Sequence, residues 1–243
     1  MATEHSDVDV YVVVENEPST WTTRRTQAID EFVVAVNDVA KPAPFGTDGW
    51  WGRWSFTHAQ VLLDRLDGGI ARMVREQAAP TPDESAVVVE ARLDGYLNFA
   101  YRSLKSATAE HSRHGFDAAE SIPWALDVIF AFEGRVRPYH EYLSWELEHH
   151  PLPEPEWRSD VLLSLLEGVL AGDPSAQREL FRVVEREARA YDGRGGSDFA
   201  ARTIEAWRRA GADAPGHGLN RASEEKQTFA REHRKFVEPW QYS

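Results

Sequence analysis

Two aspartates near the N-terminus have the spacing of a metal site on a β-strand. Asp7 and Asp9 belong to the segment Ser6-Asp-Val-Asp-Val10, and residues two apart on a strand point to the same face. Neighbouring carboxylates repel each other unless a cation lies between them, and Mg²⁺ takes oxygen ligands that it often shares with substrate phosphates. The spacing therefore indicates transfer of a phosphoryl or nucleotidyl group, in which a metal ion neutralises charge.

A strand must hold these carboxylates, and the flanking residues favour one. The segment 7–14 is rich in valine, and its alternate face carries Val8, Val10, Val12 and Val14 as an apolar stripe for a core. Two further apolar runs, 32–36 and 59–64, predict two more strands. A short helix or turn is expected at 23–28 and a helix at 70–77. The first third of the chain is thus predicted to form a small β-rich unit.

Helical periodicity begins after a boundary marked by Pro80 and Pro82. Thr81-Pro-Asp-Glu84 has the pattern of a capping box, which begins a helix. Apolar residues then recur at helical spacing, and they are Leu93, Leu97, Ala100, Leu104, Ala125, Val128, Ile129 and Phe132. Further helices are expected near 138–148, 157–171, 174–190 and 198–210. The predicted fold class is α+β, with a sheet domain at 1–79, a helical bundle domain at 80–212 and a polar tail at 213–243.

Composition excludes several classes of function. The formal net charge of −13 disfavours a broad nucleic-acid surface, which needs clustered Lys and Arg, but it would not repel a polycationic small substrate. No apolar run is long enough to span a bilayer, and the first residues lack the pattern of a secretory signal. With no cysteine, the 243-residue chain has neither disulfides nor a thiol nucleophile. We expect a cytoplasmic protein without a nucleic-acid or membrane partner.

The segment Ala2-Thr-Glu-His-Ser-Asp-Val-Asp-Val10 resembles the second half of the signature of the DNA polymerase β superfamily of nucleotidyltransferases. In that signature a Gly-Ser pair precedes the Asp-x-Asp strand, and a later strand opens with a third carboxylate. Ile29-Asp-Glu-Phe-Val-Val34 is similar to the third-carboxylate strand of aminoglycoside adenylyltransferases. The resemblance makes Asp30 the third acid. Glu31 is the alternative, because a shift of one residue changes which side chain faces the metal.

The helical half carries a second resemblance. The segments 95–105, 117–121 and 134–139 look similar to the C-terminal domain of uncharacterised bacterial nucleotidyltransferases. The resemblance implies transfer of a nucleoside monophosphate, AMP from ATP, to a hydroxyl of a small molecule or a protein. It also implies Mg²⁺ held by Asp7, Asp9 and Asp30, with Asp30 completing the metal site or acting as general base.

One face of the helix around Tyr96 carries candidate ligand-binding residues. A polar stripe lies opposite the apolar one. It consists of Asp94, Asn98, either Tyr101 or Arg102, and Lys105. If the stripe faces the sheet, Arg102 and Lys105 could hold nucleotide phosphates. The acceptor could then be held by Asp94, Asn98 and Tyr101. The alternative is that the stripe is a solvated face of the helix.

Other candidates lie outside that helix. Ser6 is a nucleotide-binding candidate beside the Asp-x-Asp pair. Arg137 could reach a phosphate bidentately, or it could pair with a neighbouring glutamate. Trp50, Trp51 and Trp54 could stack on a base, although packing in a core is the simpler interpretation.

The sequence departs from the family pattern at its beginning. The Gly-Ser pair that cradles the triphosphate is absent, which indicates a late start of the reading frame or loss of part of the nucleotide site. We therefore expect an incomplete sheet, poor ATP affinity and little transferase activity from the chain as it stands. The alternative function is a catalytically impaired nucleotidyltransferase-like binding or regulatory protein of the toxin–antitoxin type.

Overall fold

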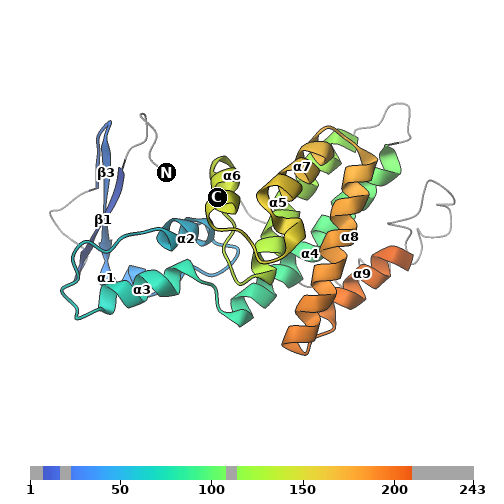
Figure 1. Ribbon diagram of the computed structural model, residues 1–243. Coiled ribbons are helices and arrows are strands. Elements are labelled where there is room, and N and C mark those ends of the chain that lie inside the picture. Colours follow the sequence, from blue (N-terminus) through green and yellow to red (C-terminus); the bar gives the residue numbers. More distant parts are fainter. Residues whose placement is uncertain (1–7, 17–22, 108–113, 210–243) are drawn as a thin grey trace, which may run out of the picture. The chain divides into compact units, whose positions relative to one another are not determined.

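In the computed structural model, the structure describes residues 8–16, 23–107 and 114–209. These residues form an α+β fold with one small mixed sheet and a mostly helical body (Figure 1). The elements are β1 (Val8–Val14), β2 (Arg24–Arg25), β3 (Ile29–Ala35), α1 (Val36–Val39), α2 (Gly49–Thr57), α3 (Gly69–Ala78), α4 (Pro82–Ser106), α5 (His114–Phe132), η1 (His140–Tyr142), α6 (Leu143–His149), η2 (Pro155–Trp157), α7 (Ser159–Leu170), α8 (Pro174–Gly195) and α9 (Phe199–Arg209).

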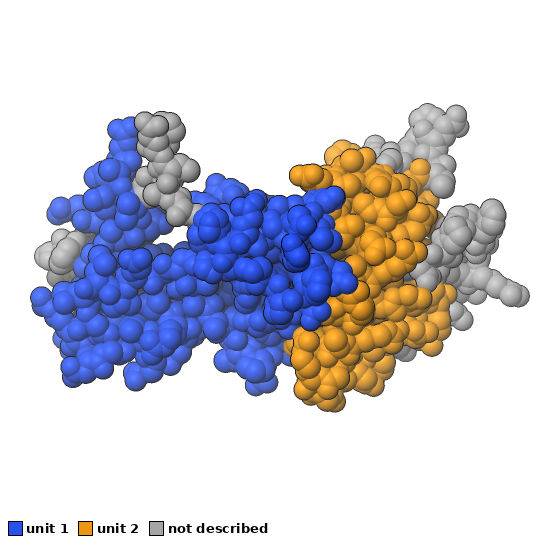
Figure 2. All heavy atoms as spheres, in the orientation of Figure 1, with its two compact units in different colours: residues 1–92, 126–164 blue, residues 93–125, 165–243 orange. Residues whose placement is uncertain are grey.

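The chain forms two compact units that are not consecutive in sequence. Unit 1 comprises residues 1–92 and 126–164, and unit 2 comprises residues 93–125 and 165–243 (Figure 2). The division passes through α4, α5 and α7. The expected domains 1–79, 80–212 and 213–243 divide the chain differently, and they stay predictions.

The sheet belongs to unit 1 and has the strand order β1-β3-β2. β1 and β3 are parallel, with Val8 opposite Ile29 and Val14 opposite Ala35, and β2 is antiparallel to β3. Thr26 forms the turn between β2 and β3, because its Oγ1 accepts a hydrogen bond of 2.9 Å from the backbone N–H of Ile29. The expected valine face is only partly buried, since the side chain of Val8 is 54% exposed.

The third predicted strand is wrong. Residues 59–64 form a loop, and the side chains of Leu62 and Leu63 are exposed. The Asp64 carboxylate fixes this loop by accepting hydrogen bonds from the backbone N–H groups of Leu66, at 2.8 Å, and Ala71, at 3.1 Å. These bonds lower the pKa of Asp64. Hydrogen bonds of the Asp64 side chain to the backbone thus outweigh the β-propensity of residues 59–64.

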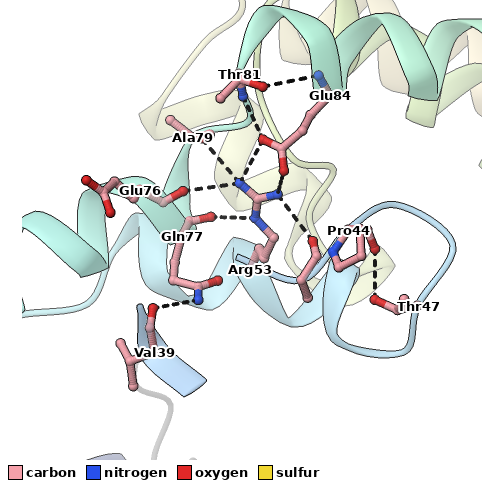
Figure 3. A network of polar contacts seen from close by, with 10 residues as sticks. Val39, Pro44, Thr47, Arg53, Glu76, Gln77, Ala79, Thr81 and Glu84 are labelled. Atoms are coloured by element: carbon pink, nitrogen blue, oxygen red, sulfur yellow. Dashed lines mark hydrogen bonds and ion pairs between the residues drawn. The ribbon is translucent and has the colours of Figure 1, made fainter. Parts of the chain in front are cut away.

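A buried arginine joins α2, α3 and α4 (Figure 3). Arg53 is 1% exposed, and its Nε donates to the carbonyl oxygen of Gln77 at 2.8 Å. Its Nη1 donates to Glu84 Oε1 at 2.8 Å, and Nη2 reaches the carbonyl of Ala79 at 3.3 Å. The positive charge therefore sits where the C-terminal carbonyls of α3 and a carboxylate in the first turn of α4 both favour it.

The predicted capping box is confirmed at the start of α4. Thr81 N–H donates to Glu84 Oε2 at 2.8 Å, and Glu84 N–H donates to Thr81 Oγ1 at 3.2 Å. The tryptophan cluster lies on helix α2 rather than in the sheet, and Trp50 and Trp54 are buried, as expected of core residues. The helices expected near 70–77, 138–148, 157–171, 174–190 and 198–210 are confirmed, with small shifts at their ends.

Local sequence also explains the long helices of unit 2. Asp173 begins α8 by accepting a hydrogen bond of 2.8 Å from the N–H of Ser175. Gly196 ends α8 in the left-handed conformation, with φ of 67°. The buried carboxylate of Asp192 then begins α9 by accepting from the N–H groups of Ala200 and Ala201. No helix among the described residues is both long enough and apolar enough to cross a membrane.

Candidate functional site

Asp9 and Asp30 lie side by side on the sheet. They are register partners on the parallel strands β1 and β3, so their side chains leave the same face from strands roughly 4.8 Å apart. Glu31 is the partner of Val10 and lies on the opposite face. Of the two candidates for the third acid, Asp30 is therefore the one that shares a face with Asp9.

The two remaining residues of the predicted motif, Ser6 and Asp7, lie outside the described residues. Within the part of the chain that the structure describes, no group of three or more His, Cys, Asp or Glu could hold a metal ion. A three-carboxylate metal site that includes Asp7 stays a prediction. What the structure provides is a pair of carboxylates on adjacent strands.

Arg25 of β2 contacts Asp30 of this acidic pair. It is the register partner of Asp30, and its Nε lies 3.5 Å from Asp30 Oδ2. The Arg25 side chain is 72% exposed, whereas that of Asp30 is 14% exposed. An ion pair with so exposed an arginine contributes little to stability. Asp30 therefore already has a cationic partner on the neighbouring strand.

Aromatic rings continue the same face of the sheet beyond the acids. Tyr11 stacks on Phe32 with ring centroids 5.4 Å apart, and it contacts Phe56 of α2 at 5.3 Å. Burial raises the pKa of the Tyr11 phenol, and the nearby Asp9 and Tyr139 raise it further. A hydrogen bond with Ser55 acts in the opposite direction. The acidic face thus adjoins α2 and the segment that contains Tyr139.

That segment also contains Arg137, which is paired with a carboxylate. Arg137 Nε lies 2.6 Å from Oδ1 of Asp127, a residue of α5. Arg92 of α4 contacts the other oxygen of the same carboxylate, with Nε 3.1 Å from Oδ2. In this ion cluster Arg137 therefore pairs with Asp127, which it shares with a second arginine.

A second buried carboxylate belongs to Glu146 of α6. No motif or spacing in the sequence marks this residue as a candidate. It is 1% exposed and accepts hydrogen bonds from Trp54 Nε1 at 3.2 Å and His58 Nε2 at 2.8 Å. Arg135 contacts its other oxygen. The rings of His58 and His150 lie with their centroids 4.6 Å apart. This cluster fixes α2 against α6, and its members come from segments too far apart in sequence for spacing to reveal.

The other predicted ligand-binding residues belong to unit 2. Arg102 and Lys105 are exposed, and Arg102 Nη2 lies 3.1 Å from Asp117 Oδ1. Asp94 accepts a hydrogen bond of 2.7 Å from Trp207 Nε1. Tyr101 is buried, and its ring contacts Trp207 with centroids 5.6 Å apart.

The polar stripe on α4 is therefore narrower than expected. Asn98 is half-buried, and between Tyr101 and Arg102 it is Arg102 that reaches solvent. The tryptophan contacts give Asp94 and Tyr101 a structural role in holding α9. Their role in acceptor binding stays a prediction.

Comparison with known protein families, with curated proteins and with solved structures gives no match to this chain.

Proposed function

We propose that this protein is a Mg²⁺-dependent nucleotidyltransferase that moves AMP from ATP to a hydroxyl of a small molecule or a protein. The observation that carries the proposal is the register pairing of Asp9 with Asp30 on one face of the sheet. Two carboxylates on neighbouring strands are held at a spacing set by the backbone, in which both can contribute oxygens to one cation.

The described residues fit magnesium by their chemistry. Mg²⁺ is commonly bound through one or two carboxylates together with waters and substrate phosphates, so the pair formed by Asp9 and Asp30 meets the protein's share of the ligands. When bound, the ion neutralises charge on the transferred group. Asp7 is proposed as an additional ligand.

Each candidate residue has a proposed task. Asp9 binds the metal, and Asp30 either completes the metal site or accepts the proton of the attacking hydroxyl. Arg137 and Ser6 are proposed to hold the nucleotide, whereas the nucleotide-binding roles of Arg102 and Lys105 and the acceptor-binding roles of Asp94, Asn98 and Tyr101, all in unit 2, stay predictions from the sequence. The net charge of −13 suits a polycationic acceptor such as an aminoglycoside.

The test is transfer of labelled AMP from ATP to a panel of aminoglycosides and to cell lysate. We expect Asp9→Asn and Asp30→Asn to abolish transfer, because each removes half of the carboxylate pair. Glu31→Gln is the matched control, since Glu31 is the next residue on the same strand and faces the other side. Equal activity of Asp30→Asn and Glu31→Gln would overturn the proposal.

The assay should be run on the 243-residue chain and on a version extended by the upstream in-frame codons. The comparison of the two versions tests whether upstream residues help to fix the triphosphate, because misplacement by about 1 Å can cost about 10²-fold in rate. If neither version transfers AMP to any acceptor, the protein is not this enzyme.

The competing proposal is a nucleotidyltransferase-like protein that binds a nucleotide or a protein partner without catalysis. The ion pair between Arg25 and Asp30 favours it, because the arginine already neutralises one of the two carboxylates. A nucleotide-binding protein of this kind binds ATP but does not transfer AMP. If the protein is such a binder, Arg25→Gln removes the ion pair but leaves the protein without AMP-transfer activity. If it is the enzyme, the same substitution frees Asp30 to bind the metal.

A further inference from the structure

We propose that Arg92 and Arg137 form a clamp for a phosphate group. The clamp itself rests on the contacts of these two arginines with Asp127. The identification of its ligand as a nucleoside triphosphate rests on the proposed function.

Three different segments of unit 1 contribute the three side chains. Arg92 comes from α4, Asp127 from α5, and Arg137 from the segment between α5 and η1. The Nε atoms of the two arginines lie 3.1 Å and 2.6 Å from the two oxygens of Asp127. One carboxylate therefore brings two guanidinium groups together.

The charges of the cluster favour an anion. Two guanidinium groups surround a single carboxylate that is only 5% exposed, so the three side chains together are positive within a chain whose net charge is −13. His140 reports the same local field, because its pKa is lowered by burial and then by the positive charge of Arg137, with Asp127 opposing. A phosphate group would find a positive centre here.

The two arginines are also held in place before any ligand binds. The guanidinium of Arg92 lies over the ring of Phe45, 5.0 Å from its centroid, and Phe45 packs edge-on against Trp50. The side chains of Arg92 and Arg137 are 17% and 12% exposed. Less side-chain freedom is therefore lost on binding than with exposed arginines, and the planar fork of guanidinium matches phosphate oxygens.

The clamp shares unit 1 with the acidic face of the sheet. Tyr139 follows Arg137 by two residues and lies near enough to Tyr11 to raise the pKa of its phenol. Tyr11 in turn shares its face with Asp9, two residues before it on β1. The segment that provides Arg137 thus adjoins the face on which the metal-binding carboxylates are proposed.

A buried ion cluster can also be purely structural, and breaking one is costly whether or not it binds a ligand. The experiment must therefore measure ligand binding as well as stability. The probe is tripolyphosphate in EDTA at low salt, titrated into the full chain and followed by calorimetry, because it has the phosphate chemistry of ATP without the base, the ribose or the metal.

We expect tripolyphosphate to bind the wild type, and we expect Arg137→Gln and Arg92→Gln each to weaken binding by about tenfold or more, because each removes a charge-assisted contact. Arg72→Gln is the control, since Arg72 is an exposed arginine of unit 1 that pairs across a helix turn with Glu76. If either glutamine variant fails to fold, Arg137→Lys and Arg92→Lys keep the charge and lose the fork, and they should weaken binding by a smaller factor.

Two outcomes would overturn the clamp. One is a wild type that does not bind tripolyphosphate, and the other is binding by folded Arg92 and Arg137 variants that equals that of Arg72→Gln. Asp9→Asn and Asp30→Asn should keep tripolyphosphate affinity in EDTA. If neither the 243-residue chain nor the extended version transfers AMP, but tripolyphosphate binding still depends on Arg137, the enzyme proposal is rejected and the clamp stands.

A final comparison identifies the source of the phosphate. Titration with ATP, with tripolyphosphate and with adenosine separates a nucleotide from a free polyanion. ATP binding at least as tight as tripolyphosphate, with loss of both in Arg137→Gln, supports a nucleotide. Binding of tripolyphosphate without binding of ATP overturns that identification.

Discussion

Asp9 and Asp30 occupy the same register position on two adjacent parallel strands, so two carboxylates project from one face of the sheet. Like charges directly opposite each other destabilise a sheet by a few tenths of a kcal/mol up to about 1 kcal/mol. We therefore expect Asp9→Asn to raise the free energy of unfolding by an amount in this range in EDTA. The same substitution should severely weaken the binding of Mg²⁺ with ATP, because it removes half of the local negative charge.

Urea unfolding in EDTA and calorimetry with Mg²⁺ and ATP measure the two effects separately. Glu31→Gln, on the opposite face, should leave the Mg²⁺–ATP affinity unchanged. A destabilised Asp9→Asn variant with wild-type affinity for Mg²⁺ and ATP would contradict the assignment of the carboxylate pair to metal binding.

Glu146 is the second relationship that can be tested by a matched pair of variants. Its buried carboxylate contacts Trp54, His58 and Arg135, whereas Glu148, two residues on, is exposed. We expect Glu146→Gln to lower the free energy of unfolding by about 3 kcal/mol, because it leaves a half-buried guanidinium without its carboxylate. Glu148→Gln should stay within about 0.5 kcal/mol of the wild type. Similar unfolding midpoints in urea for the two variants would show that the cluster does not stabilise the fold.

Glu84 should make stability depend on pH. Burial alone would raise its pKa, but hydrogen bonds from Arg53 and from the N–H of Thr81 outweigh burial, and the folded pKa lies below the ordinary value of 4.5. The charged form is therefore favoured by folding, so its contribution is complete above about pH 4.5 and is lost as the pH falls through the folded pKa. The measurement is the unfolding free energy of the wild type and of Glu84→Gln between about pH 7 and about pH 3. The difference between the two should shrink as the pH falls, and a constant difference would contradict this account.

Gly95 marks a close approach of α4 and α5 within unit 2. A Cβ added to Gly95 would lie 2.3 Å from a ring carbon of Trp124. We expect Gly95→Ala to lower the free energy of unfolding by about 1–2 kcal/mol, because overpacking exceeds the helix propensity gained from alanine. Gly115 is the control, since a Cβ added there would have no heavy atom within 4 Å. Gly115→Ala should be neutral or stabilising by up to about 1 kcal/mol in thermal unfolding, and equal effects at both sites would contradict a tight contact.

Features that depend on neighbouring residues along the chain could be predicted from the sequence. The valine-rich run of β1, the capping box of Thr81 and Glu84, and the apolar period of α4 each follow from a few consecutive residues, so their elements were predicted correctly. The spacing also placed Asp9 and Asp30 on strands. It left open whether Asp30 or Glu31 shares the face of Asp9, because a one-residue shift of register exchanges the faces and only strand pairing fixes the register.

Which polar residues meet inside the protein depends on the packing of segments that lie far apart in sequence. Asp127 contacts arginines from two other segments, and Glu146 contacts side chains from α2 and from the segment after α5. The run at 59–64 became a loop rather than a strand because the carboxylate of Asp64 bonds to the backbone N–H groups that follow it. Such contacts depend on how segments distant in sequence are brought together and on which local hydrogen bonds prevail, and neither composition nor periodicity along the chain encodes them.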